Sequence, residues 1–115
     1  MSAAAAWVPG LGPLESAIMT AIWNAGQPLS VRMVRERMDY QVADGEDPAY
    51  TTVMSVMVIL WRKRFLDRAR CSGAGHRRAW WYAARISRED HLATVIRQAL
   101  DCAPDPAAVL RRATA

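Results

Sequence analysis

Apolar side chains recur every three or four residues in four segments of the chain, which is the pattern of a helix with one buried face. The first segment begins at Pro13, because proline suits the first helical position, and it ends at Gly26. The second is a short helix that Ser30 caps, the third starts at Pro48, and the fourth opens at Ser87. The apolar positions of the first three helices are Leu11, Leu14, Ile18, Ile22 and Ala25, then Val31, Val34 and Met38, and then Val53, Val56, Met57 and Leu60.

Between the third and fourth helices the pattern changes from helical to alternating, as in β-strands. Residues 65–71 and 79–83 are the predicted strands, and the segment between them holds two glycines that suit a hairpin tip. In the second strand Trp80 and Tyr82 should pack under the helices while Trp81 faces solvent, although exposed rings could also stack on unpaired bases. Residues 107–115 have room for one or two further helical turns.

The order helix, helix, helix, hairpin, helix is that of a winged helix-turn-helix. We therefore predict a mainly α fold with a small β-hairpin, followed by a C-terminal dimerisation helix. The predicted division is a flexible arm at residues 1–10, a winged-helix domain at residues 11–85, and a dimerisation helix with a short tail at residues 86–115. A winged-helix core can close without covering all of the last helix, which leaves an apolar stripe for a second subunit. The residues of that stripe are Leu92, Val95, Ile96, Ala99 and Leu100.

Charge is spread unevenly along the 115 residues, whose net charge is +4. Residues 1–49 hold three basic and six acidic side chains, whereas residues 50–115 hold twelve basic and five acidic ones. Fourteen of the fifteen cations are arginine, which binds phosphate bidentately, although a genome rich in G and C would also favour arginine codons. A basic hairpin either follows a phosphate backbone or is a solvated charged surface. The cations of this hairpin are Arg68, Arg70, His76, Arg77 and Arg78.

The third helix has an outer face that begins with hydroxyl groups and ends with cations. At 100° per residue, the side chains opposite its buried stripe are those of Thr51, Ser55, Val58 and Arg62, flanked by Thr52 and Ile59. Such a face suits a recognition helix, whose side chains meet base edges in the major groove of DNA. An ordinary amphipathic surface helix would show much of the same pattern.

Other kinds of chemistry find little support in the sequence. Cys71 and Cys102 cannot form a four-ligand zinc site, so reduced thiols are expected, although a disulfide between them stays open. His76 and His91 have no cysteine or carboxylate at ligand spacing and are interpreted as surface residues. There is no nucleophile motif or phosphate-binding loop, so we predict no cofactor, no metal and no enzymatic activity. The sequence has neither a signal peptide nor a membrane-spanning stretch, which predicts a cytoplasmic protein.

Several of these motifs resemble the BlaI/MecI penicillinase-repressor family, which includes the copper-responsive CopY repressors. The resemblance covers residues 11–100, and its motifs are Leu11-Gly-x-Leu14-Glu15-x-x-Ile18-Met19-x-x-Ile22-Trp23, Val31-Arg32-x-Val34, Ala49-Tyr50-Thr51-Thr52-Val53-Met54-x-Val56, Arg62-Lys63 and Arg78-Ala79-Trp80-x-Tyr82. It implies a dimeric winged-helix repressor that binds a palindromic operator in double-stranded DNA. In antibiotic-responsive members, a membrane sensor triggers proteolysis of the repressor.

Together, the resemblance and the outer face of the third helix give a set of expected DNA contacts. The base contacts are Thr51, Thr52 and Ser55, and the phosphate contacts are Arg62, Lys63, Arg77 and Arg78. The chain departs from the family at Val58 and Ile59, where a polar pair is usual, and at Arg64, where a glycine is usual. It also lacks the Cys-x-Cys tail of copper-responsive members, and its short C-terminus predicts a weaker dimer. The alternative function is a protein-binding module that docks through Val58, Ile59 and Trp61.

Overall fold

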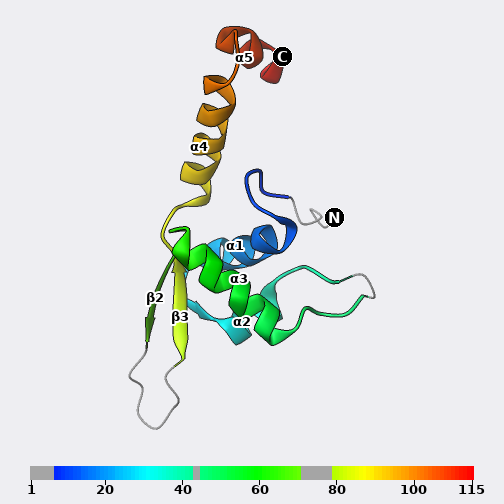
Figure 1. Cartoon of the computed structure of the whole chain (residues 1–115), viewed down its shortest axis with the longest axis vertical. Coiled ribbons are helices and arrows are strands. Elements are labelled where there is room, and N and C mark those ends of the chain that lie inside the picture. The colour runs from blue at the N-terminus through cyan, green and yellow to red at the C-terminus, as the bar shows by residue number, and fades with distance from the viewer. Residues whose placement is uncertain (1–6, 43–44, 71–78) are drawn as a thin grey trace.

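The computed structural model describes residues 7–42, 45–70 and 79–115, and in this part of the chain it contains five helices and one three-stranded sheet (Figure 1). The arrangement is a winged helix, as the order of the sequence patterns predicted. In chain order the elements are α1 (Pro13–Ala25), β1 (Leu29–Ser30), α2 (Val31–Arg37), α3 (Tyr50–Arg62), β2 (Leu66–Arg70), β3 (Trp80–Ala84), α4 (Arg88–Asp101) and α5 (Pro106–Ala113).

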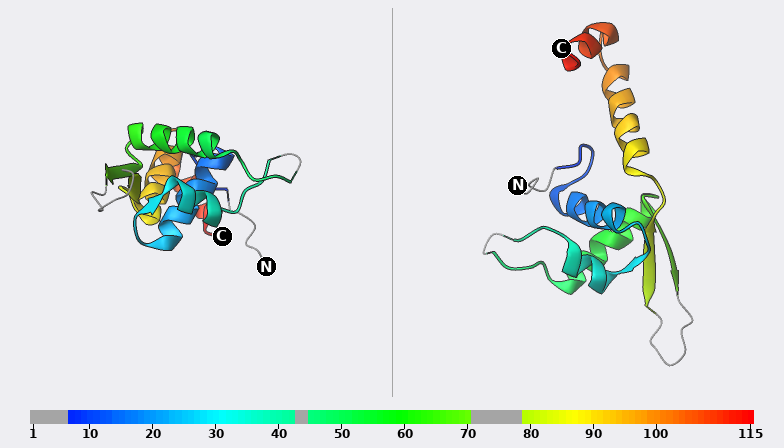
Figure 2. Two further views of the ribbon diagram at one scale, coloured as in Figure 1. Left: turned by 90° about the horizontal axis from the view of Figure 1, so that it is seen from below. Right: turned by 180° about the vertical axis from the view of Figure 1, so that it is seen from behind.

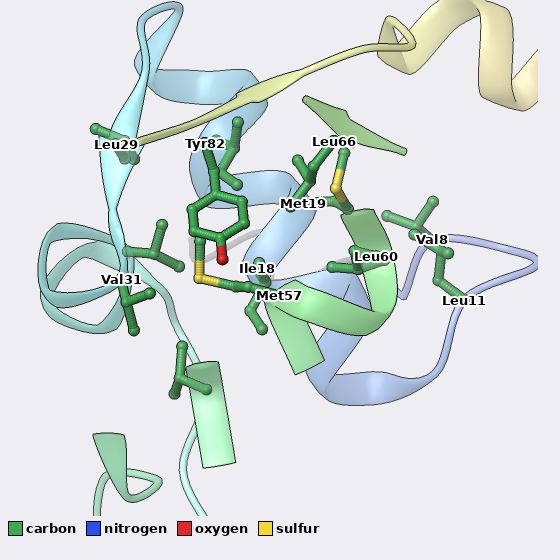
Figure 3. Close-up of a cluster of buried hydrophobic side chains, with 13 residues drawn as sticks. Val8, Leu11, Ile18, Met19, Leu29, Val31, Met57, Leu60, Leu66 and Tyr82 are labelled. Atoms are coloured by element: carbon green, nitrogen blue, oxygen red, sulfur yellow. The ribbon is translucent and has the colours of Figure 1, made fainter. Parts of the chain in front are cut away.

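The first three helices and the sheet enclose one hydrophobic core (Figure 3). Burial follows the predicted stripes, with Ile18 on α1 and Val53, Met57 and Leu60 on α3 all fully buried. Tyr82 points from β3 into the same cluster, as the alternation of the aromatic residues predicted. Burial of this apolar surface is the main favourable term that holds α3 in place. One face of α3 is therefore fixed against the body, and the opposite face is free.

Local signals set most of the helix ends. The Gly12 N–H donates to the Glu15 carboxylate at 3.0 Å at the start of α1, and Gly26 ends that helix with a φ of 65°. The hydroxyl oxygens of Ser30 and Ser87 each accept a hydrogen bond from the N–H three residues later, as predicted for the N-caps of α2 and α4.

The third helix begins at Tyr50, two residues later than predicted. Ala49 is its N-cap, and the carbonyl of Ala49 accepts the first helical hydrogen bond, from the Val53 N–H at 3.1 Å. Because Ala49 is extended, with φ −62° and ψ 148°, helical geometry starts only after it. Pro48 is buried before the helix, and its carbonyl accepts a hydrogen bond from Arg35 Nε at 2.7 Å.

The sheet has the order β1-β3-β2, with antiparallel pairing throughout. The hairpin strands lie within one residue of their predicted ends, with Leu66 opposite Ala84. The sequence pattern missed β1, which pairs Leu29 with Tyr82. A strand of two residues has no period to detect, and it exists only because β3 offers it an edge. Through β1, the wing is hydrogen-bonded directly to the start of α2.

Residues 7–10, which the sequence placed in a flexible arm, pack against the body. Val8 is buried, and its N–H donates to Ser16 Oγ at 3.1 Å. Trp7 Nε1 donates to the Leu11 carbonyl at 2.8 Å. The prediction of a loose segment is therefore wrong for residues 7–10, since Val8 is buried and hydrogen bonds connect this segment to Leu11, to Ser16 on α1 and to His91 on α4. Residues 1–6 of the predicted arm lie outside the described part.

The fourth helix leads away from the body and carries α5 at its far end (Figures 1 and 2). Its first turn is anchored by His91, which was predicted to be a surface residue but is only 5% exposed. His91 Nε2 donates to the Pro9 carbonyl at 2.7 Å, since a carbonyl can only accept. The rings of Trp23 and Phe65 lie 6.2 Å and 5.2 Å from the imidazole ring. The prediction failed because these partners come from distant parts of the chain.

Candidate nucleic-acid interface

Seen from below, α3 forms the outer layer on one side of the body (Figure 2, left). The predicted base contacts Thr51, Thr52 and Ser55 are all exposed on it. Its buried stripe of Val53, Met57 and Leu60 faces the core and leaves these side chains free. The structure thus brings the three hydroxyl groups together on the first two turns of an exposed helix, as a recognition helix requires.

The Ser55 hydroxyl is already engaged within the helix. Its Oγ donates to the Thr51 carbonyl at 2.9 Å, the back-bond that serine often makes in a helix. In this conformation the Ser55 hydrogen is used, and the oxygen can only accept from a partner in solvent. Ser55 therefore suits a base that presents an amino group.

Apolar side chains follow the hydroxyl groups on the same outer face. Ile59 is 44% exposed and Val58 is half-buried. Met54, which is 39% exposed, and Tyr50, which is 48% exposed, lie on the flank of the helix. None of these side chains is needed by the core, because the opposite stripe of α3 fills it. The exposed surface of α3 is thus largely apolar between its hydroxyl groups and its terminal cation.

Two of the predicted phosphate contacts lie at the end of α3. Arg62 is exposed, and within the described residues it forms no ion pair. Lys63 is different, because its Nζ lies 2.9 Å from Glu15 Oε2 on α1. Partial burial would raise the pKa of Glu15, but the hydrogen bond from Gly12 and the ion pair with Lys63 outweigh it and lower the pKa below 4.5. Lys63 would have to leave this carboxylate to reach a phosphate.

The chain turns from α3 into β2 at Arg64, in the conformation that usually requires glycine. Arg64 has a φ of 68° and is the one non-glycine residue with a positive φ among the described residues. The Arg64 N–H donates to the Trp61 carbonyl at 3.0 Å, and the Phe65 N–H donates to the Leu60 carbonyl at 2.9 Å. These two bonds form a Schellman motif, so the tight turn persists although glycine is absent. Arg64 thereby adds an exposed cation next to Arg62.

The predicted wing cation Arg68 is half-buried against two tryptophan rings. Its guanidinium carbon lies 3.7 Å from the ring centroid of Trp61 and 4.1 Å from that of Trp80. Its Nη1 lies 3.4 Å from the Tyr82 hydroxyl, and its Nε is buried without a hydrogen-bond partner among the described residues. Arg68 therefore joins α3 to the wing and is not a free surface cation.

This packing also limits the alternatives considered for the aromatic residues. Arg70 is exposed and places its guanidinium carbon 4.5 Å from the ring centroid of Trp80, which leaves less of that ring free for a base. Trp81 is half-buried beside Pro28 and Met33, although it was expected to face solvent. Trp61, the third residue of the alternative protein-docking patch, is half-buried under Arg68.

Four predicted features of the wing lie outside the described residues: Cys71, His76, Arg77 and Arg78. Cys102 is exposed and forms no disulfide in the described part. No cluster of three potential metal ligands occurs among the described residues. No helix in that part is long and apolar enough to cross a membrane.

The stripe on α4 is divided between the body and solvent. Leu92 packs against the core of its own domain, and Val95 lies beside Gly10. Ile96 is 56% exposed and Ala99 is exposed, while Leu100 is half-buried. The first turn thus serves the domain itself, whereas the outer part of the predicted dimer contact remains uncovered in a single chain.

The sequence matches the model of the penicillinase repressor family over residues 11–112. It is also similar to the transcriptional regulator BlaI of Mycobacterium tuberculosis, from strain CDC 1551 / Oshkosh and from strain ATCC 25618 / H37Rv, at 36% identity over 95 residues in each case. The matched segment covers 83% of this chain and 62% of each relative. The chain thus spans less than two thirds of the length of these curated relatives. No solved structure matches the chain.

Proposed function

The chain belongs to the penicillinase repressor family, as its motifs predicted, and we propose that it is a transcriptional repressor that binds duplex DNA. The observation that carries the proposal is the exposed face of α3, where hydroxyl groups are followed by cations on a winged-helix body. In this fold the third helix enters the major groove and the wing follows the adjacent backbone. The curated relatives are transcriptional regulators by name, which supports the same function.

In this proposal the residues of the interface have two separate roles. Thr51, Thr52 and Ser55 touch base edges, since they occupy the first two turns of the exposed face. Phosphate contacts come from cations at the end of α3 and in the wing, and these set affinity without reading sequence. The proposed phosphate contacts are Arg62, Lys63, Arg77 and Arg78.

We further propose that two subunits bind a palindromic operator. The division into a winged-helix domain at residues 11–85 and a dimerisation helix at residues 86–115 is part of this proposal. Ile96 and Ala99 form the exposed centre of the contact, and Leu92 contributes mainly to its own domain. The repressor would act in the cytoplasm, where a membrane sensor and a protease would relieve repression.

The test is duplex binding measured across a salt series. Each phosphate contact contributes about 0.9 to the slope of log affinity against log salt. Replacing Arg77 and Arg78 together with glutamine should therefore lower the magnitude of the slope by roughly 2. Replacing Arg111 and Arg112 with glutamine is the matched control, because it removes the same charge from α5, at the opposite end of the molecule from the wing strands (Figure 1).

The slope separates the proposal from its alternatives. An unchanged slope for the α5 variant and a reduced one for the wing variant would support the assignment. Equal reductions in both variants would indicate attraction by net charge alone. Affinity for duplexes that does not respond to salt would contradict the proposed phosphate contacts, and absence of duplex binding at any salt concentration would favour a protein partner.

A further inference from the structure

The exposed face of α3 lacks the side chains that usually read bases by hydrogen bonding. Residues 50–61 contain no charged and no amide side chain. Bidentate readout in the major groove depends on arginine, lysine, asparagine or glutamine, so it is not available along this stretch. The Ser55 hydrogen is also committed to the Thr51 carbonyl. Base recognition by this part of α3 therefore relies mainly on single hydroxyl groups and on apolar contact.

The apolar groups are placed where a base would meet them. Val58 and Ile59 lie on either side of the line from Ser55 to Arg62, within the arc that faces away from the core. Ile59 is 44% exposed, whereas Met57 and Leu60 beside it are fully buried. An exposed isoleucine in the centre of this face has no packing role in the fold. It offers an apolar surface to a group that meets this face of the helix.

The charges at the end of the helix indicate which kind of molecule presents such an apolar group. Arg62 and Arg64 are exposed directly after the apolar pair, and Arg70 is exposed on β2. An apolar contact with cations beside it fits the major groove, where the C5-methyl group of thymine projects between two phosphate backbones. A purely apolar protein surface would leave these cations without counter-charges.

We propose that Val58 and Ile59 make α3 selective for thymine, by packing against the C5-methyl group at the base pairs that face them. The proposal rests on the proposed function, since it specifies how the same helix reads duplex DNA. In this proposal, the hydroxyl groups on the first two turns of α3 contact base edges, and the apolar side chains on the third turn contact thymine methyl groups. The order of side-chain types along α3 therefore determines which kind of base contact occurs at each position of the duplex.

The experiment removes the methyl group and nothing else. Duplexes that bind the full chain are first selected from a random pool at moderate salt. The tightest duplex is then resynthesised with each thymine replaced in turn by deoxyuridine, which keeps every hydrogen-bonding group. We expect about a fourfold loss of affinity at one or two positions in each half-site, the factor for removing one methyl-sized apolar contact, and no loss at the other thymines.

Protein variants assign the effect to residues. Ile59→Ala should lower affinity for the thymine duplex and abolish the loss caused by deoxyuridine at one position, and Val58→Ala should do so at a neighbouring position. Val42→Ala is the matched control, because Val42 is also an exposed aliphatic residue, at 41%, but lies outside α3. That variant should keep the full deoxyuridine effect.

Each outcome bears on one of the two proposals. Tight binding of the selected duplex with no deoxyuridine effect at any position would overturn thymine selection and leave DNA binding intact. A deoxyuridine effect that persists unchanged in both Ile59→Ala and Val58→Ala would overturn the residue assignment. Failure to select any duplex at moderate salt, and again when the selection is repeated at low salt, would overturn the proposed function itself, and the thymine proposal with it. The deoxyuridine measurement uses the unaltered protein, so it stands even where a variant fails to fold.

Discussion

Replacing Arg64 with glycine should stabilise the protein, although it removes a cation and a long side chain. Arg64 sits at the turn after α3 with a φ of 68°, where a Cβ atom is strained. The hydrogen bonds from Arg64 to Trp61 and from Phe65 to Leu60 hold it there, so the strain cannot relax without losing the Schellman motif. Glycine adopts the same conformation without a Cβ penalty.

The net gain follows from two opposing terms. An L-residue in the left-handed region costs about 1–2 kcal/mol, which the substitution recovers. Glycine also makes the unfolded chain more flexible, which costs about 0.4–1 kcal/mol. At the middle of the two ranges, the difference is a gain of about 0.8 kcal/mol in the free energy of unfolding. For a domain of this size, that corresponds to a rise in Tm of about 2–5 °C.

The assay is urea unfolding at one fixed protomer concentration, and the comparison variants are Arg64→Ala and Arg64→Asn. Alanine removes the same charge but keeps the strained Cβ, so its stability should stay near that of the unaltered protein. Asparagine tolerates the left-handed region better than most residues and should fall between alanine and glycine. A gain in Arg64→Ala as large as that in Arg64→Gly would refute the reasoning, because relief of charge repulsion would then explain both.

Three further predictions each concern a single residue. Arg68→Gln should lower the free energy of unfolding by about 1 kcal/mol through loss of its stacking on Trp61 and Trp80, and should leave the salt slope of DNA binding unchanged; a slope lowered by about 1 would place Arg68 on a phosphate. Ile96→Glu should raise the dimer dissociation constant at least about tenfold in sedimentation, and unchanged self-association would show that α4 is not the contact. The pKa of Glu15 is lowered in the folded state, so its stabilising effect is present above pH 4.5 and is lost as the pH falls through the folded-state pKa. In urea unfolding, Glu15→Gln should therefore be less stable near neutral pH and converge with the unaltered protein in acid, whereas a constant difference would contradict the ion-pair explanation.

The parts of the fold that could be predicted are those with local causes. The N-caps at Ser30 and Ser87, the C-cap at Gly26 and the buried stripe of α3 depend on residues three or four positions apart. Such signals are complete within one turn of helix, and they are visible in the sequence. The hairpin was also predictable, because its alternation is local.

The parts that were missed depend on partners far away in the chain. His91 is an ordinary surface histidine by sequence, and it is buried only because Pro9, Trp23 and Phe65 meet around it. By its position in the sequence, Arg68 was interpreted as an exposed cation of the wing, yet its guanidinium group packs on two tryptophan rings from other elements.

The candidate site likewise has features that could be predicted from the sequence and features that could not. Exposure of Thr51, Thr52 and Ser55 followed from helical periodicity. The pairing of Lys63 with Glu15 spans 48 residues and had no signal in the sequence, because it requires α3 to lie across α1. The commitment of the Ser55 hydrogen to the Thr51 carbonyl depends on a rotamer, which periodicity does not specify.

The contacts that close the body also set the order in which a growing chain can fold. The hydrogen bond from Trp23 to the Ile86 carbonyl spans 63 residues, and that from His91 to the Pro9 carbonyl spans 82. At 5–20 residues per second, the first helix waits about 3–13 s on the ribosome before Ile86 is added. During that time α2, α3 and the three strands are made, but the hydrogen bond from Trp23 to Ile86 cannot yet form. The hydrogen bond from His91 to Pro9 can form only after His91 has left the ribosome, so the body closes long after its first helix has been made.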